Sequence, residues 1–233
     1  MALILNIETS TAVCSAALTE GDEVLFEQHS FEGPSHASLL GVYVEKALQW
    51  AKAQGRTLDA VAVSCGPGSY TGLRIGVSVA KGLCFGADIP LISVPTLTLL
   101  ADTAIRRMEQ PADYRYCAMI DARRMEVYAA IYDAQRQQER QPMAEVVDAQ
   151  TYAALLEKGP VCFFGDGAAK CQSVIAHPNA HFLTDVYPLA SGMAALSAQA
   201  YAEERFENVA YFEPFYLKEF QATIAKNKVL NQG

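Results

Sequence analysis

Residues 66–76 read Gly66-Pro67-Gly68-Ser69-Tyr70-Thr71-Gly72-Leu73-Arg74-Ile75-Gly76, and this stretch decides the fold. The apolar residues 60–64 before it predict a buried strand, and the apolar spacing after it predicts a helix to about Gly86. In a strand-to-helix loop the backbone N–H groups and the helix dipole favour an anion. The loop lacks the lysine and spacing of a Walker loop, and its third glycine falls one residue late for a dinucleotide-binding loop. The stretch therefore predicts an α/β unit in which Gly66 and Gly68 are candidates for contact with a phosphate.

The helix that follows carries a stripe of small residues, because Gly72, Gly76 and Ala80 recur every four positions. Glycine inside a helix costs about 0.5 to 1 kcal/mol relative to alanine, so the stripe indicates close packing. The helix is apolar over most of its circumference, and we expect it to be covered on two sides. One side faces the chain's own sheet, and the other faces either the predicted helix 35–54 or a second subunit. The candidate subunit-interface residues are Leu40, Tyr43, Ala47, Gly72, Leu73, Gly76, Val79 and Ala80.

Upstream of the loop, the sequence predicts a three-stranded meander followed by a helix. The helix is expected to begin at Ser35 and to end at Gly55. Downstream of the loop helix, a strand over 90–94 and a helix over 96–108 complete the order β-β-β-α-β-α-β-α. The predicted meander strands are residues 3–7, 14–18 and 24–28.

After Pro111 the pattern partly restarts. Residues 5–8, ending in Glu8, match residues 118–121, ending in Asp121, at an offset of 121 minus 8, or 113 residues. Each copy is an apolar strand that delivers one acid to a polar turn, which indicates an internal duplication. The second half continues with a hairpin (116–120 and 127–132), a helix (151–157), a strand (161–164), a turn (165–167) and a helix (192–206). We therefore expect an N-terminal lobe (1–110), a reduced C-terminal lobe (111–221) and a polar tail (222–233).

Composition excludes several classes of protein. The chain has 233 residues, of which 51% are apolar and 19% charged, which is typical of a globular protein with one or two domains. Its net charge is −8 and it has no basic run, so we expect weak nucleic-acid binding by the chain alone. The N-terminus lacks a cationic secretion signal, and the apolar stretches are shorter than the ~20 residues that span a bilayer. The six scattered cysteines indicate reduced thiols, and we expect a cytoplasmic protein without membrane association.

The turn Glu8-Thr9-Ser10-Thr11 is a second candidate for ligand contact. Its hydroxyl and N–H groups could hold phosphate oxygens, with the acid placing a divalent ion. Alternatively, these side chains hydrogen-bond their own backbone, as they do in many turns. With the glycine loop, the turn gives the candidate cofactor-binding residues Thr9, Ser10, Thr11, Gly66 and Gly68.

Searches for a metal site and a nucleophile find no catalytic constellation. His177 and His181 are four residues apart, but Pro178 between them argues against one helix presenting both rings. No G-x-S-x-G elbow occurs, and no cysteine has an adjacent histidine to activate it. We expect neither catalytic nor metal-binding residues.

Four segments carry a resemblance to a known family. The residues 4–10, 66–76, 120–128 and 213–218 resemble the bacterial tRNA threonylcarbamoyladenosine biosynthesis proteins called TsaB or YeaZ, over nearly the whole chain. The resemblance implies the duplicated RNase H-like fold of actin and the sugar kinases, with a reduced second half. It also implies a non-catalytic subunit that pairs with the related catalytic protein TsaD, together with the ATPase TsaE. That complex transfers threonylcarbamoyl from its adenylate to the adenosine beside the tRNA anticodon.

Departures from TsaD support a non-catalytic role. The resemblance places Thr96 and Leu100 where TsaD has the two histidines that bind its metal, and leucine offers no lone pair to a metal. Glu8 stands where many members of the superfamily have aspartate. We therefore expect no bound cofactor, although a nucleotide at the subunit interface is left open. We expect the chain to form a homodimer when it is alone. We expect it to contact tRNA only through the complex. The alternative is a stand-alone metal-dependent peptidase or phosphotransferase of the same superfamily.

Overall fold

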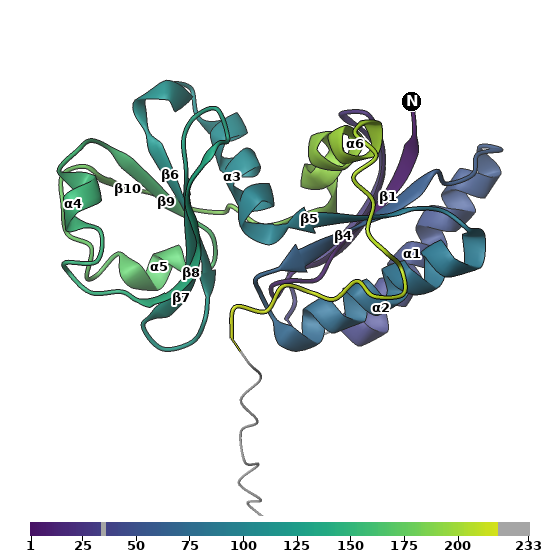
Figure 1. The fold of residues 1–233 in the computed structure, drawn as a ribbon, viewed down its shortest axis with the longest axis horizontal. Coiled ribbons are helices and arrows are strands. Elements are labelled where there is room, and N and C mark those ends of the chain that lie inside the picture. Colours follow the sequence, from purple (N-terminus) through teal and green to yellow (C-terminus); the bar gives the residue numbers. More distant parts are fainter. Residues whose placement is uncertain (34–35, 219–233) are drawn as a thin grey trace, which may run out of the picture.

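The computed structural model describes residues 1–33 and 36–218, which form two lobes side by side (Figure 1). Each lobe is built on one five-stranded sheet, with the order β3-β2-β1-β4-β5 in the first and β8-β7-β6-β9-β10 in the second. The predicted N-cap Ser35 and the predicted tail 222–233 lie outside the described residues. No helix in the described part of the chain is long and apolar enough to cross a membrane.

The first sheet starts with an antiparallel meander and continues with two strands parallel to its central strand. Its strands are β1 (Leu3–Glu8), β2 (Cys14–Glu20), β3 (Glu23–Ser30), β4 (Ala60–Gly66) and β5 (Leu91–Pro95). Its helices are α1 (His36–Ala53), α2 (Tyr70–Ala87) and α3 (Thr96–Arg107). Strand residues point alternately to opposite faces, so Leu3, Leu5 and Ile7 pack with α1 and α2, whereas Ile4 packs on the other face.

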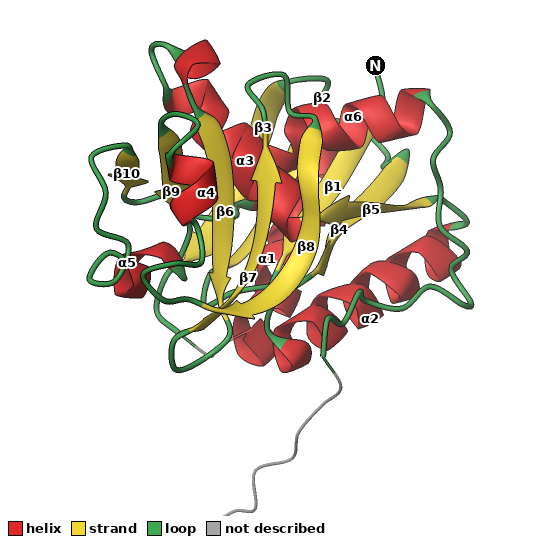
Figure 2. Ribbon diagram, turned by 60° about the vertical axis from the view of Figure 1, so that its left-hand side comes forward, coloured by secondary structure: helices red, strands yellow, loops and turns green. Residues whose placement is uncertain are grey.

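The second sheet repeats this plan with shorter helices (Figure 2). Its strands are β6 (Arg115–Asp121), β7 (Glu126–Tyr132), β8 (Gln138–Val146), β9 (Val161–Phe164) and β10 (Ala180–Leu183). The short helices η1 (Pro111–Asp113), α4 (Ala153–Leu156) and α5 (Ala168–Cys171) accompany them. β6 occupies the central position that β1 holds in the first sheet. The predicted duplicated RNase H-like fold with a reduced second half is therefore confirmed, including the predicted match between Glu8 and Asp121 at the ends of β1 and β6.

Helix α3 lies between the two sheets and contributes to both cores. Leu97, Leu100 and Ala104 pack against the second sheet, whereas Leu99 packs against Ile4 and its neighbours in the first. One rigid helix therefore joins the lobes and fixes the walls of the space between them.

The predicted lobe boundary is wrong for the C-terminal residues. The predicted helix 192–206 is a short turn, η2 (Ala190–Met193), followed by α6 (Ala194–Ala202). Both return to the first lobe, where Met193 and Ala200 complete the core around Ile4 (Figure 1). The physical reason is that this face of the first sheet needs an apolar cover, which α3 alone does not provide. The chain then continues along α2 as an extended segment, residues 203–218, which we call the C-terminal strap.

Candidate functional site

The glycine loop and the Glu8–Thr11 turn lie directly against each other. The backbone N–H of Ser69 donates a hydrogen bond of 2.6 Å to the carbonyl oxygen of Ser10. The hydroxyl of Thr9 donates a hydrogen bond of 2.8 Å to the carbonyl oxygen of Gly72. The structure thus brings the two predicted ligand-binding segments together, at the carboxyl ends of β1 and β4.

The contact between the two segments explains why the loop contains glycines. A Cβ at Gly68 would lie 2.2 Å from the carbonyl oxygen of Ser10, and a Cβ at Gly66 would lie 2.6 Å from that of Phe215. Gly66 also has a φ of +106°, in the region that favours glycine. Both glycines therefore admit the chain's own backbone, and no phosphate fits between the two segments. Thr9 and Ser10 are fully buried. Contact of the turn with a ligand remains a prediction.

The small-residue stripe of α2 is also filled from inside the chain. A Cβ added at Gly72 would lie 2.1 Å from the carbonyl oxygen of Thr9, and one added at Gly76 would lie 2.3 Å from the Thr9 hydroxyl. The stripe therefore packs on the Glu8–Thr11 turn, which corrects its assignment to a subunit interface. The predicted interface residues that are buried in the chain are Leu40, Ala47, Gly72, Leu73, Gly76 and Ala80. Tyr43 and Val79 are partly exposed.

Glu8 lies beneath this contact and is completely buried. Its Oε1 accepts a hydrogen bond of 2.5 Å from the backbone N–H of Ser10. Burial raises the pKa of Glu8 from 4.5 to about 7, the Ser10 N–H and the hydroxyls of Ser10 and Ser64 partly oppose this rise, and the charge of Asp166 adds to it. The Glu8 carboxylate lies beneath the turn, and the predicted placing of a divalent ion there stays a prediction.

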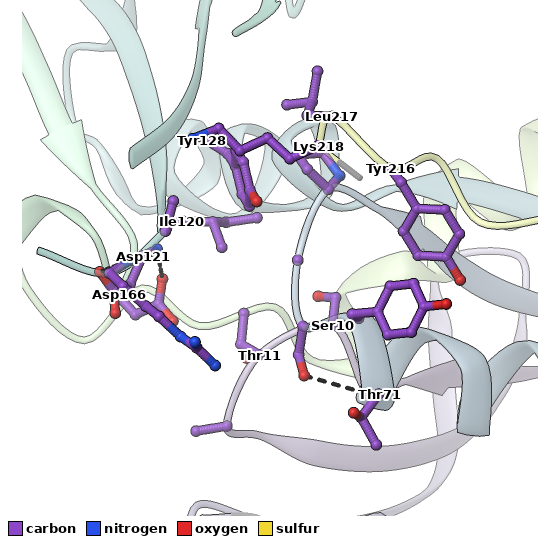
Figure 3. A pocket seen from close by; sticks show the side chains of 18 of the residues that line it. Ser10, Thr11, Thr71, Ile120, Asp121, Tyr128, Asp166, Tyr216, Leu217 and Lys218 are labelled. Carbon is purple, nitrogen blue, oxygen red and sulfur yellow. Dashed lines mark hydrogen bonds between the residues drawn. The ribbon is translucent and has the colours of Figure 1, made fainter. Parts of the chain in front are cut away.

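A cleft of about 690 Å³ opens between the lobes, in the size range of small-molecule sites. The first lobe lines the cleft with the N-terminal ends of α1 and α2. The second lobe lines it with the end of β6 and the turn that follows. The last residues of the strap line it from a third side (Figure 3). The polar and aromatic residues lining it include Ser10, Thr11, His36, Ser69, Thr71, Asp121, Arg123, Glu126, Tyr128, Asp166, Tyr216 and Lys218. Of the predicted ligand-binding residues, Ser10, Thr11 and Gly68 border this cleft.

The second-lobe wall repeats the plan of the first. The Asp166 carboxylate accepts a hydrogen bond of 2.9 Å from the backbone N–H of Asp121 (Figure 3). The Asp121 side chain pairs with Lys170. Asp166 stays exposed at the rim of the cleft, and partial desolvation there raises its pKa, with the charge of Asp121 adding to the rise and the Asp121 N–H and Lys170 opposing it. The turn after Asp121 holds Arg123 and Arg124 at φ values of +71° and +52°, an arrangement seldom adopted by residues with side chains.

The C-terminal strap forms a wall of the cleft that was indicated only by the resemblance of residues 213–218. The backbone N–H of Phe215 donates a hydrogen bond of 2.7 Å to the carbonyl oxygen of Cys65. The ring of Tyr216 lies 4.9 Å from the ring of Tyr70, between centroids. Lys218 pairs with Glu126 of the second lobe. The strap thereby links the first lobe to the second across one side of the cleft.

The positions expected to replace the metal-binding histidines are buried. Leu100 packs in the core against the second sheet, and Thr96 is fully enclosed at the start of α3. His177 accepts a hydrogen bond from the backbone N–H of Asn179, and His181 lies edge-on against Tyr114. Within residues 1–33 and 36–218, no group of three or more His, Cys, Asp or Glu side chains is placed to hold a metal ion. The absence of a metal stays a prediction.

Comparisons with known proteins agree on one family. The model of the TsaD family, described as tRNA N6-adenosine threonylcarbamoyltransferase, matches residues 33–226. The tRNA threonylcarbamoyladenosine biosynthesis protein TsaB of Escherichia coli (strain K12) is 30% identical over 223 residues, which is 92% of this chain and 94% of the relative. TsaB of Bacillus subtilis (strain 168) is 33% identical over 165 residues, which is 70% of each chain.

A solved structure shows the same fold. YeaZ from Pseudomonas aeruginosa superposes with a TM-score of 0.76 and 28% sequence identity, covering 93% of this chain and 100% of that one. The match spans both lobes, including the reduced second half. Together with the glycine loop, the duplicated sheets and the sequence relatives, it shows that this chain belongs to the TsaB family, also called YeaZ.

Proposed function

We propose that this protein acts in tRNA threonylcarbamoyladenosine biosynthesis as a non-catalytic subunit that binds and supports TsaD. The family supports the pathway, because the TsaB relatives are named for it. The match to the TsaD family model supports the choice of partner, since related chains present related surfaces. The main structural support for this proposal is a partly exposed apolar face on α1 and α2.

This α1–α2 face consists of Leu39 and Tyr43 on α1 and Ile75, Val79 and Leu83 on α2. All five side chains pack partly against the first core and remain partly open to solvent. On each helix they are spaced four residues apart and therefore form a stripe. Exposed apolar stripes on neighbouring helices are typical of a helix-docking surface.

Two glycines give this face room for close approach by another chain. Gly82 and Gly86 are exposed on α2, and a Cβ added at either would have no atom within 4 Å. They contrast with Gly72 and Gly76, whose Cβ positions are occupied by Thr9. The interface therefore moves along α2 from the predicted stripe to the neighbouring side of the same helix. Val79 and Tyr43 are the predicted residues that remain in it.

The same face accounts for the proposed homodimer. TsaD belongs to the same wider family, so its corresponding helices would offer a similar surface. A chain without TsaD would cover its apolar face with a second copy, in an isologous contact. Binding of TsaE would follow assembly with TsaD, and tRNA would be held through the complex.

The alternative of a stand-alone metal-dependent peptidase or phosphotransferase has less support. Leu100 belongs to the core and Thr96 is enclosed, so neither is available to bind a catalytic metal. The glycine loop contacts the chain's own backbone and leaves no room for a phosphate between it and Ser10. We propose no bound cofactor, and a nucleotide at the interface with TsaD is left open.

Substitution of Gly82 tests the proposed interface without touching the core. Gly82→Leu adds a side chain to open space on the α1–α2 face, whereas Gly41→Leu adds the same side chain to open space on α1. At about 100° per residue, Gly41 lies roughly 160° around α1 from Leu39, so it serves as a matched control. The experiment measures the mass of each variant by analytical ultracentrifugation, alone and mixed with TsaD from the same organism.

We expect Gly82→Leu to weaken both the homodimer and the complex with TsaD by roughly five- to 150-fold, as an overpacked contact would. Gly41→Leu is expected to associate like the unmodified chain. Equal association of both variants with TsaD would contradict the interface, and no association of the unmodified chain with TsaD would contradict the proposed function.

A further inference from the structure

A second pocket, of about 330 Å³, opens between α2 and the C-terminal strap, which runs along that helix (Figure 1). It shares two tyrosines with the cleft between the lobes and extends from them along α2. The polar residues that line it are Tyr70, Arg74, Ser78, Lys81, Glu213 and Tyr216. The pocket therefore combines two cations with one acid and several hydroxyl groups.

The two cations reach the pocket from the same side of α2. Arg74 and Lys81 are seven residues apart, which is about two turns of helix, so their side chains project in nearly the same direction. Neither pairs with a carboxylate in the part of the chain that the structure describes, whereas Arg56 pairs with Glu20 elsewhere on the first lobe. The pocket is thus a positively charged site in a chain of net charge −8.

Both cations keep hydrogen-bond donors that are not yet used. One N–H of the Arg74 guanidinium bonds the hydroxyl of Tyr70 at 2.9 Å, and the other guanidinium N–H groups have no partner among residues 1–33 and 36–218. The ammonium of Lys81 donates to the carbonyl oxygens of Ala210 and Phe212 at 3.1 Å each, which leaves its third N–H available. A ligand that satisfies these donors has to supply negatively charged acceptor atoms.

The guanidinium of Arg74 is held in place by the protein itself. Besides its hydrogen bond to the Tyr70 hydroxyl, it lies over the Tyr70 ring, 5.5 Å from the ring centroid. The Tyr70 ring in turn packs against the ring of Tyr216, with 4.9 Å between centroids. An arginine that is already oriented loses little side-chain entropy on binding, and its planar fork matches the two oxygens of a carboxylate.

The net charge of the pocket favours a carboxylate over a phosphate. Arg74 and Lys81 carry two positive charges and Glu213 carries one negative charge, which leaves one positive charge uncompensated. An aspartate or glutamate side chain brings one negative charge, whereas a phosphate group on a side chain brings about 1.5 to 2. Repulsion by Glu213 would therefore act more strongly against a phosphate than against a carboxylate.

The pocket borders the surface on which we place TsaD. Ser78 lines the pocket, and Gly82, one helical turn further along α2, lies on the α1–α2 face. We propose that an aspartate or glutamate side chain of the docked TsaD enters this pocket and pairs with Arg74. The inference rests on the proposed function, because the acid comes from the chain that covers the α1–α2 face. Such a charged contact beside an apolar surface fixes the orientation of the partner.

Titration calorimetry of this chain with TsaD, in buffer without nucleotide, tests the inference. Arg74→Gln removes the charge and the fork from the pocket, whereas Lys158→Gln removes one positive charge from an exposed site on the second lobe and serves as the control. We expect Arg74→Gln to weaken the complex roughly ten-fold, as for the loss of a partly buried charge pair. Arg74→Glu should weaken it further because two acids then meet, and Lys158→Gln should bind like the unmodified chain.

The dependence on salt separates a charge contact from a packing effect. The affinity of the unmodified chain should fall as NaCl rises from ~50 mM to ~500 mM, and that of Arg74→Gln should fall less, because screening acts on the charge pair. Equal affinity of Arg74→Gln and the unmodified chain, or the same loss with salt in both, would overturn the inference. A loss of affinity confined to samples with added ATP would assign the pocket to a phosphate and would also overturn it. Failure of the unmodified chain to bind TsaD would instead contradict the proposed function itself.

Discussion

The hydroxyl of Thr9 stands 2.3 Å from the place that a Cβ at Gly76 would occupy, and it donates its hydrogen bond to the carbonyl oxygen of Gly72. The turn after β1 and the second helix are thus fitted to each other through one side chain. This relationship explains the glycine stripe as a feature of the monomer.

Gly76→Ala should therefore destabilise the monomer by about 1 to 3 kcal/mol, because the methyl group overpacks against Thr9. In a Thr9→Ala background the nearest remaining Thr9 atom is its Cβ at 3.5 Å, an ordinary contact, and most of this cost should disappear. Urea unfolding of the two single variants and the double variant measures the coupling. If the destabilisation of the double variant equals the sum of the two single variants, the two side chains do not clash. Self-association of the folded Gly76→Ala protein should be unchanged.

Stability should depend on pH through Glu8. Burial raises the pKa of Glu8 from its ordinary value of 4.5 to about 7 in the folded chain, so the folded state binds this proton more tightly than the unfolded state. This contribution is favourable at low pH and is lost as the pH rises from 4.5 through about 7, by about 3 kcal/mol in total. Denaturant unfolding across this pH range measures the change, and Glu8→Gln should flatten this part of the profile. The same slope in both proteins would assign the effect to other groups.

The C-terminal strap should loosen when Lys81 is changed. The ammonium of Lys81 donates to the carbonyl oxygens of Ala210 and Phe212, at 3.1 Å each. Lys81→Met keeps the length of the side chain but removes both bonds, so the amide of Phe215 should exchange with solvent roughly ten-fold faster, as for the loss of about 1.4 kcal/mol. Hydrogen exchange read by mass spectrometry checks this, with the amides of β6 as the internal control. Unchanged exchange at Phe215 would show that other contacts hold the strap.

Binding of tRNA by the chain alone should be weak. The net charge of −8 leaves little release of counterions from tRNA to drive association. Filter binding at physiological salt checks this prediction, and submicromolar affinity without TsaD would contradict it.

The periodic elements of the fold could be predicted because each has a local pattern. Residues 3–7 are a short, almost wholly apolar run that ends at a polar turn. The helices α1 and α2 have apolar stripes, and the match between Glu8 and Asp121 indicates the duplication. β8 was missed because its sequence, residues 138–146, is polar and contains a proline, so it has no apolar alternation. β10 was missed because four residues are too few to show a period.

The site could be predicted only in part, because its contacts join distant residues. The loop and the turn were identified as candidates, yet nothing local shows that Gly68 faces Ser10, which is 58 residues earlier by 68 minus 10. Likewise, the small residues at Gly72 and Gly76 indicate close packing without naming the partner. Gly82 and Gly86 are equally small, and only the fold distinguishes an open position from a filled one. The strap has no periodic structure, so its path along α2 depends on single contacts such as those of Lys81.

The most direct test of the central claim is the formation of threonylcarbamoyladenosine on tRNA in purified reactions supplied with threonylcarbamoyl adenylate, TsaE and ATP. Reactions contain this chain alone, TsaD alone, or both proteins. The account predicts no product from this chain alone and much faster product formation by the pair than by TsaD alone. Product formed by this chain without TsaD, or an equal rate with and without it, would contradict the account.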